Sequence, residues 1–330
     1  MSPGNTRRKM LGALGLTGAA VVAPRVWAQS GLAYPTRAVR LLCPFAAAGG
    51  VDITARAIGQ KLTALWGQPV VVENKPGANG TIAVDLMVKA APDGYTLSMI
   101  SSSHSVNETL QRQHPYDLAL DVAPITQATI QPYVLVVNPS LPVRSVGELV
   151  ALARKNPGKY TYGSSGLGGL SHLAGALFGS LAGIDLTHIP YKGGALAMSD
   201  VISGQIDMLF STILQSHGHL VSGRLRGLAV TTGQRSPSMP DTPTMQESGV
   251  KDYEVAGWYG VVAPAATPVP ILDKLNKDIV AVLRTPDMRE RLAVDGSEPV
   301  GNTREQFGAF IRSEIAKWRN LIRELGIKSE

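Results

Sequence analysis

Two glycine-rich segments, residues 44–52 and 163–172, hold the residue types best suited to binding chemistry. Each segment runs from an expected strand into an expected helix, and the first N–H groups of a helix have no acceptor within it. Those N–H groups and the helix dipole together favour an anion such as a carboxylate. We therefore predict an anion site in each segment. Asp52 either caps the first helix or takes part in its site.

Neither segment matches an enzyme motif closely. The first lacks the Gly-Lys-Ser/Thr ending of a phosphate-binding loop. In the second, Ser171 replaces the third glycine of the dinucleotide motif, and Leu167 replaces a glycine of the nucleophile elbow. Ser165 or Ser171 with His172 would make a secreted hydrolase, but adjacent side chains on a helix do not face each other. We predict no catalytic residue.

A third polar run, the serines at residues 101–103, follows another expected strand. The carboxyl ends of strands in open α/β sheets hold ligands, so these serines either line the same site or form a polar turn. Among six histidines, only His217 and His219 have a spacing worth testing for metal binding. No third ligand of recognisable spacing accompanies them, so we predict neither a metal nor a cofactor.

The composition is that of a globular chain. Of its 330 residues, 44% are hydrophobic and 17% charged, which excludes a disordered protein or a charged coiled coil. This length suggests about two domains. The single cysteine, Cys43, excludes an intrachain disulfide and an all-cysteine metal site. Four cations and no acid lie in the first 28 residues, so the formal charge of +6 falls to +2 in the remainder and no nucleic-acid partner is expected.

The N-terminus is typical of an export signal. A basic start contains Arg7 and Arg8, an apolar stretch covers residues 11–22, and a small-residue cleavage site ends at Ala28. The apolar stretch is shorter than the roughly 20 residues that a spanning helix requires. We therefore predict a signal peptide over residues 1–28 and a periplasmic mature chain that is not embedded in the membrane. The paired arginines leave both the general secretory route and the twin-arginine route open.

Hydrophobic periodicity predicts two series of alternating strands and helices. The first series has strands at 39–44, 69–74 and 95–100, and helices at 51–65 and 81–90. A proline-containing segment, 124–142, separates it from the second series. That series has helices at 145–155, 171–183 and 195–204, and strands at 160–163, 186–189, 206–210 and 225–230. A crossing segment at 258–263 precedes helices at 269–284, 287–295 and 303–325, and the alternation predicts parallel sheets covered on both faces.

Several ordered motifs along the chain resemble one known family. They comprise residues 34–35, 44–52, 55–56, 72–78, 91–97, 162–166, 171–174, 188–194 and 258–260. Together they resemble the extracytoplasmic solute receptors of the tripartite tricarboxylate transporters, also called Bug receptors. The resemblance covers nearly the whole chain after the expected signal peptide.

The resemblance implies an α/β protein with the type II periplasmic-binding-protein fold, in which two α/β domains enclose a ligand cleft. Residues 29–127 and 256–330 would form a discontinuous first domain, and residues 128–255 the second. The expected function is capture of a small organic acid by a monomeric receptor, which delivers it to inner-membrane permease subunits. A receptor that signals to a membrane histidine kinase is the alternative.

The resemblance also implies which residues line the cleft. Those expected to contact the carboxylate ligand are Phe45, Ala47, Ala48, Gly49, Gly50, Asp52, Ser101, Ser102, Ser103, Ser164, Ser165, Gly168, Ser171, Phe210 and Ser211. Ala48 and Val51 depart from the family, which often has glycine at the first position and threonine or serine at the second. A pocket more apolar on that side is therefore expected, and either a dicarboxylate or an apolar monocarboxylate would suit it.

Overall fold

The computed structural model describes residues 33–110, 115–191, 193–293 and 296–327. The expected signal peptide and Lys192 lie outside these described residues. The elements below all belong to one unit of the chain, residues 34–330.

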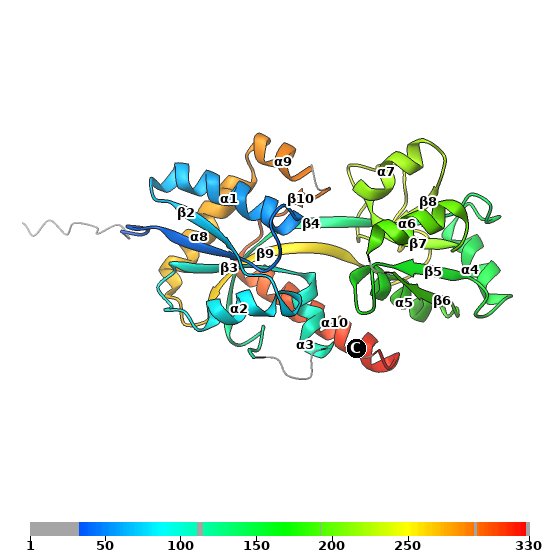
Figure 1. Ribbon diagram of the computed structural model, residues 1–330, viewed down its shortest axis with the longest axis horizontal. Helices are drawn as coiled ribbons and strands as arrows, with labels where there is room; N and C mark the ends of the chain where they lie inside the picture. The colour runs from blue at the N-terminus through cyan, green and yellow to red at the C-terminus, as the bar shows by residue number, and fades with distance from the viewer. Residues whose placement is uncertain (1–32, 111–114, 192, 294–295, 328–330) are drawn as a thin grey trace, which may run out of the picture. The chain divides into compact units, whose positions relative to one another are not determined.

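Three parallel strands form one end of the sheet (Figure 1). They are β1 (Val39–Cys43), β2 (Val70–Asn74) and β3 (Thr96–Ser101), in the order β2-β1-β3. Helix α1 (Gly50–Trp66) follows β1, and the short 3-10 turn η1 (Ala78–Gly80) leads into α2 (Thr81–Val88). The five elements predicted for this series are confirmed, with ends shifted by one or two residues.

A second set of parallel strands lies further along the chain. It consists of β5 (Thr161–Ser164), β6 (Thr187–Pro190) and β7 (Met208–Thr212), in the order β7-β5-β6. Three helices accompany it, α4 (Val146–Arg154), α5 (Leu170–Ala182) and α6 (Gly194–Ser203). These elements also agree with the prediction to within two residues at each end.

Two long strands join the two sets. The first half of β4 (Val122–Val137) pairs with β9 (Ala256–Pro264), and its second half pairs with β7 and β8 (Arg226–Val230). These pairs are antiparallel, as are β3 with β9 and β4 with β10 (Glu298–Pro299). The prediction of purely parallel sheets is therefore wrong. The predicted domain boundaries, after residues 127 and 255, fall within β4 and directly before β9, and the division into domains stays a prediction.

The structure also corrects the interpretation of residues 124–142 as a separating segment, because most of them belong to β4. Pro124 has no N–H to donate, and the pairing with β9 shifts register between Pro124 and Thr126. This proline therefore lies at an irregularity in the ladder, where a missing donor is tolerated. Because proline is rare within strands, the local sequence did not predict this strand of 16 residues.

Two helices are not indicated by the sequence, α3 (Ser102–Leu110) and α7 (Ile213–Val221). Each follows directly on a strand. Helix α3 buries the polar residues His104, Ser105 and Asn107, so it lacks the apolar stripe that marks an amphipathic helix. Helix α7 carries the two histidines considered above as metal ligands.

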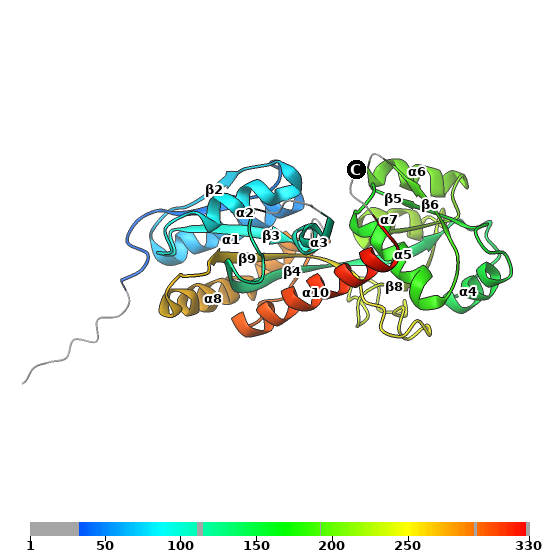
Figure 2. The ribbon, with the colours of Figure 1, turned by 90° about the horizontal axis from the view of Figure 1, so that it is seen from below.

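The C-terminal region contains the three predicted helices, α8 (Val269–Leu283), α9 (Pro286–Ala293) and α10 (Arg304–Glu324). Near the start of α10, Phe307, Ile311 and Ile315 are buried in the core beneath the first strand set. Near its end, Trp318 and Ile322 are buried in the core of the second set. Figure 2 shows α10 extending toward α5, with which it makes contact. Within the described part of the chain, no helix is both long and apolar enough to cross a membrane.

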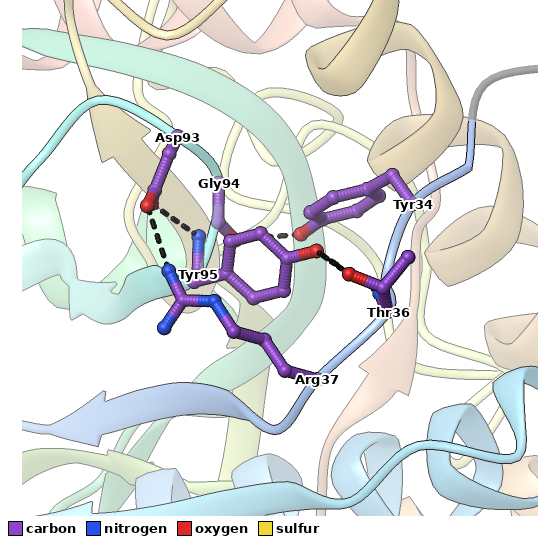
Figure 3. A network of polar contacts seen from close by, with 6 residues as sticks. All are labelled: Tyr34, Thr36, Arg37, Asp93, Gly94 and Tyr95. Carbon is purple, nitrogen blue, oxygen red and sulfur yellow. Dashed lines mark hydrogen bonds and ion pairs between the residues drawn. The ribbon is translucent and has the colours of Figure 1, made fainter.

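The start of the described chain is held to the loop before β3 (Figure 3). The Tyr34 hydroxyl donates to the carbonyl of Gly94 at 2.5 Å. The Arg37 guanidinium lies 4.0 Å from the centroid of the Tyr95 ring and pairs with Asp93 at 2.9 Å. Two motifs of the family resemblance therefore meet here. They lie at the amino end of β3, opposite the end from which the candidate site extends.

Candidate functional site

The candidate loops of the two strand sets face one another. Strands β3 and β4 are both antiparallel to β9, so the first strand set runs in the same direction as β4. It lies next to the first half of β4. Strand β7 is antiparallel to the second half of β4, so the second strand set runs in the direction opposite to β4. The carboxyl ends of the two sets therefore point toward each other. These are the ends at which open α/β sheets bind ligands.

The register along β4 gives the separation of these ends. The last residue of β3, Ser101, lies level with Thr129 of β4, because both pair with Tyr259. The last residue of β7, Thr212, pairs with Tyr133 of β4. The two levels are four residues apart on an extended strand, which is about 13 Å at ~3.3 Å per residue. A small organic molecule with its hydrogen bonds spans such a distance.

Asp52 organises the loop that connects β1 to α1. Its buried carboxylate accepts hydrogen bonds from the Ala48 N–H and Arg56 Nε at 2.9 Å each and from Asn74 Nδ2 at 2.8 Å. Burial alone would raise the pKa of Asp52, but the hydrogen bonds from Arg56, Ala48 and Asn74 outweigh it and hold the pKa below its ordinary value. The N-cap of α1 is Gly49, so Asp52 holds the loop and does not cap the helix.

The N-terminus of α1 presents backbone donors beside this loop. The first bond within the helix is donated by Ile53 to the Gly49 carbonyl at 2.9 Å. The N–H groups of Gly50 and Val51 precede it and have no acceptor within the helix. Residues 46–49 are exposed and carry at most a methyl side chain. Backbone donors with so little in front of them suit a carboxylate.

Ala48 adopts the left-handed conformation, with φ 66°. We expect Ala48→Gly to raise the free energy of unfolding by about 0.5 kcal/mol, because relief of about 1 kcal/mol of strain outweighs the added freedom of the unfolded chain. Ala47→Gly, which relieves no such strain, should lower it by about 0.5 kcal/mol. Urea unfolding of both variants measures the contrast. Equal destabilisation of the two would contradict it.

The serines of the second loop, which connects β5 to α5, differ in their placement. The Ser171 hydroxyl accepts from the Ser165 N–H at 2.9 Å, and the two hydroxyl oxygens lie 3.1 Å apart. The Ser164 hydroxyl accepts from the Gly166 N–H at 3.1 Å. Ser164 and Ser171 are buried, whereas Ser165 is exposed. The first two therefore shape the loop, and Ser165 presents its side chain to solvent.

Gly168 lies where this loop approaches α3. Its φ is 70°, and a Cβ built on it would be 2.6 Å from Leu110 Cδ1. Only glycine meets both conditions without strain. The Gly168 N–H donates to His172 Nδ1 at 3.0 Å, so the position of the loop depends on a histidine of α5.

The predicted serines at 101–103 occupy the junction of β3 and α3. Ser101 and Ser102 are buried, and Ser103 is half-buried. The Ser101 N–H donates to His104 Nδ1 at 3.0 Å. The His104 ring lies edge-on to Phe45 of the first loop, with centroids 6.2 Å apart. The serine junction and the first loop are therefore neighbours.

Three positions expected at the ligand lie in the protein interior. Phe210 is fully buried, with its ring centroid 6.0 Å from that of Phe178. Ser211 is also buried, and its hydroxyl bonds with Ser216. Val51 is buried with Leu41 and Ile58 in the core on which α1 packs, and the apolar pocket expected beside it stays a prediction. Side chains alternate between the two faces of a strand and repeat every 3.6 residues around a helix, and at these three positions they point inward.

Apolar side chains that were not predicted at the site lie near the same strand ends. Leu167 of the second loop is 48% exposed, and Leu214 in the first turn of α7 is 47% exposed. With half-buried Phe45, they make these surroundings partly apolar. Residues 44–49 and 165–169 contain no charged side chain. A leucine in a glycine-rich loop is the sequence signal that could have identified Leu167.

The serine–histidine pairs considered for a hydrolase are not formed. His172 Nδ1 accepts from Gly168, and Ser171 bonds with Ser165. A different pair is close, since His188 Nε2 lies 2.7 Å from the Ser164 hydroxyl oxygen. Ser164 has no exposed surface, so no substrate reaches it. These contacts stabilise a loop and do not activate a nucleophile.

Residues 54–327 match the family described as the tripartite tricarboxylate transporter family receptor. The chain is 36% identical over 297 residues to the protein BugT of Bordetella pertussis, and the match covers 89% of this chain and 91% of that protein. The comparison therefore extends over both strand sets and both candidate loops.

Solved structures of related proteins have the same fold as this chain. The structure of R. palustris Rpa4515 with adipate is 36% identical with a TM-score of 0.72, covering 89% of this chain and 99% of the other. The structure of the periplasmic binding protein BugD is 34% identical with a TM-score of 0.69, covering 90% of this chain and 100% of the other. The predicted fold class, an α/β periplasmic binding protein, is confirmed.

Proposed function

Since this chain belongs to the tripartite tricarboxylate transporter receptor family, we propose that it binds a small organic carboxylate in the periplasm and delivers it to an inner-membrane transporter. The family and its solved members are solute receptors, so the protein is a binding protein and not an enzyme. Periplasmic location is supported by the family and by the export signal expected from the sequence.

The observation that carries the proposal is the pair of helix starts at the facing strand ends. Helix α1 begins at Gly50 beside the first loop, and α5 begins at Leu170 beside the second. In α5 the first intrahelical bond is donated by Leu173 to the Gly169 carbonyl at 3.0 Å, so the earlier N–H groups have no helical acceptor. Two sets of backbone donors that face each other suit the two ends of a dicarboxylate.

The side chains near these helix starts favour an aliphatic dicarboxylate as the ligand. Exposed Leu167 and the alanines at residues 46–48 offer apolar contact to the body of such a ligand. A tricarboxylate would bring a third charge to loops that hold no cation, at a cost in desolvation. The related R. palustris protein with adipate supports the same class. We therefore take adipate as the first ligand to test.

Calorimetry of the purified protein with three compounds tests the ligand class. We expect adipate to bind, adipamide to bind at least 100-fold more weakly, and citrate to bind at least tenfold more weakly than adipate. Adipamide is the matched control, because it keeps the chain length and removes both charges. Comparable binding of adipamide would contradict a carboxylate site. Tighter binding of citrate would contradict a site for two carboxylates.

Uptake measurements separate a transport receptor from a sensor. Deleting the gene in the native host should abolish uptake of labelled adipate, and restoring the gene should recover it. If uptake persists while the transcriptional response to the acid disappears, the protein is the sensory receptor that the sequence left as the alternative.

A further inference from the structure

Two histidines behind the second loop stack directly on each other. His172 lies in the first turn of α5, and His188 lies on β6. Their ring centroids are 4.0 Å apart, with 17° between the ring planes. The Tyr162 ring of β5 completes the cluster at 4.9 Å from His188 and 6.4 Å from His172. Register explains the meeting, since His188 pairs with Tyr162 across β5 and β6.

Each imidazole makes a hydrogen bond to one end of the second loop. His172 Nδ1 accepts from the Gly168 N–H at 3.0 Å, near the end that enters α5. His188 Nε2 lies 2.7 Å from the Ser164 hydroxyl oxygen, at the end that leaves β5. The Ser164 hydroxyl oxygen in turn accepts a hydrogen bond from the Gly166 N–H at 3.1 Å, so His188 also helps to position Gly166. The stacked pair therefore supports both ends of the loop from behind.

We propose that His172 and His188 are positioning residues for the second loop, and that protonation of His172 releases Gly168 and weakens ligand binding in acid. The proposal rests on the proposed function in one respect, that the second loop meets the ligand. Neither histidine has to touch the ligand, because each acts through its hydrogen bond to the loop.

The protonation state of the pair follows from its surroundings. Burial lowers the pKa of His172. Burial, and then the charge of His172, lower the pKa of His188 to about 4. Both rings are therefore neutral at neutral pH, when stacking carries no charge repulsion. As a neutral ring whose Nδ1 accepts a hydrogen bond, His172 holds its proton on Nε2.

No carboxylate from the neighbouring described elements offsets a positive charge on the pair. On the same face, Tyr162 donates to the His172 carbonyl at 3.4 Å, and Tyr253 donates to the Ala174 carbonyl at 3.0 Å. The pKa of each phenol is raised by burial, so both stay neutral. The nearest acid of α6, Asp200, accepts from Tyr191, whose ring faces Gly163 on the other side of β5. A proton on either histidine therefore meets only neutral groups and the other ring.

The direction of the pH effect follows from these facts. A protonated His172 carries hydrogen on both ring nitrogens and cannot accept from Gly168. The pKa of His172 is lowered while it holds the loop. His172 therefore takes up a proton more readily once its hydrogen bond with Gly168 is broken. Acid therefore favours release, and the loop is fully held only at pH values above the ordinary histidine pKa. Asp52 does not share this window, because its pKa is held below an already lower ordinary value.

Adipate binding measured by calorimetry from pH 7.5 to 4.5 tests the proposal. The wild-type affinity should be constant above the ordinary histidine pKa and then fall, by at most about tenfold per pH unit, as the pH drops through the lowered pKa of His172. His172→Asn offers an amide oxygen in place of Nδ1 and does not titrate, so its affinity should fall far less in acid. His172→Phe keeps the ring but loses the acceptor, so its affinity should be low at every pH. Protonation of adipate itself is common to all variants and cancels in their ratios.

His217→Asn is the control for loss of a histidine, since His217 is exposed on α7, and its pH profile should match that of the wild type. Parallel profiles for His172→Asn and the wild type would overturn the proposal. So would an undiminished affinity in a folded His172→Phe variant.

A measurement without ligand separates this proposal from the proposed function. The NMR shift of the Gly168 amide should follow the titration of His172 in the wild type and stay constant in His172→Asn. If the amide follows the histidine but adipate does not bind at pH 7.5, the proposed ligand class fails and the positioning role stands. If adipate binds but the amide ignores the histidine, the positioning role fails.

Discussion

Asp52→Ala is expected to lower the affinity for adipate by about 100-fold. The substitution removes the acceptor of the Ala48 N–H, of Arg56 Nε and of Asn74 Nδ2 at once. Loss of a buried charged acceptor costs about 2–3 kcal/mol, and about 1.4 kcal/mol corresponds to a tenfold change in affinity. The loop before α1 would then no longer hold its donors in place.

Two variants separate loop geometry from charge. Asp52→Asn retains one acceptor oxygen, so its affinity should fall about tenfold. Arg56→Gln removes an exposed partner of both Asp52 and Asn74 and should change affinity less than about threefold. Calorimetry at pH 7.5 measures all three. A wild-type affinity in Asp52→Ala would show that the first loop does not contact the ligand.

Glu314→Ala is expected to lower the free energy of unfolding by about 3 kcal/mol and the melting temperature by about 6 °C. The buried Glu314 carboxylate accepts from the indole N–H groups of Trp258 on β9 and Trp318 on α10, at 3.1 Å each. It also pairs with Lys317, which donates to the Glu254 carbonyl at 3.0 Å. The substitution leaves two buried donors without an acceptor, at the point where α10 passes from one core to the other.

Thermal and urea unfolding test this value, and a change in tryptophan fluorescence, to which both indoles contribute, reports on their surroundings. Glu324→Ala is the matched control, because Glu324 is an exposed acid of the same helix that accepts from Ser180 at 3.1 Å. It should change stability by less than about 0.5 kcal/mol. Similar effects of the two substitutions, or an unchanged emission spectrum in Glu314→Ala, would contradict the assigned role.

The elements that the sequence predicted well are those with a regular apolar pattern. The helices from 51–65 to 303–325 and the parallel strands place apolar residues at the period of their element, so neighbouring residues suffice to identify them. Strand β4 was not predicted because it contains prolines, and α3 was not predicted because it buries polar residues. In both cases long-range pairing and packing override local preference.

The site residues divide in the same way. Glycine, alanine and serine at a strand-to-helix turn identified both loops. The free backbone N–H groups of each loop follow from the start of a helix alone, which neighbouring residues determine. Which side chains face a ligand depends on register and helix rotation. Phe210 and Val51 turn into the cores, whereas Leu167 turns to solvent. Asp52 was found, but its role in holding the Ala48 N–H needed the folded loop.

The sequence by itself determined the family, the alternation of strands and helices, and the two loops with their helix starts. These follow from patterns within a few residues of each other. The family resemblance implied that both loops line one cleft. The tertiary structure provides the physical reason, because the antiparallel pairing of β4 with β9 and β7 makes the carboxyl ends of the two strand sets point toward each other. It also decided that His172 and His188 stack, because they meet only through the β5–β6 register and the packing of α5 on those strands. Contacts of that kind depend on how whole elements pack, which no local pattern specifies.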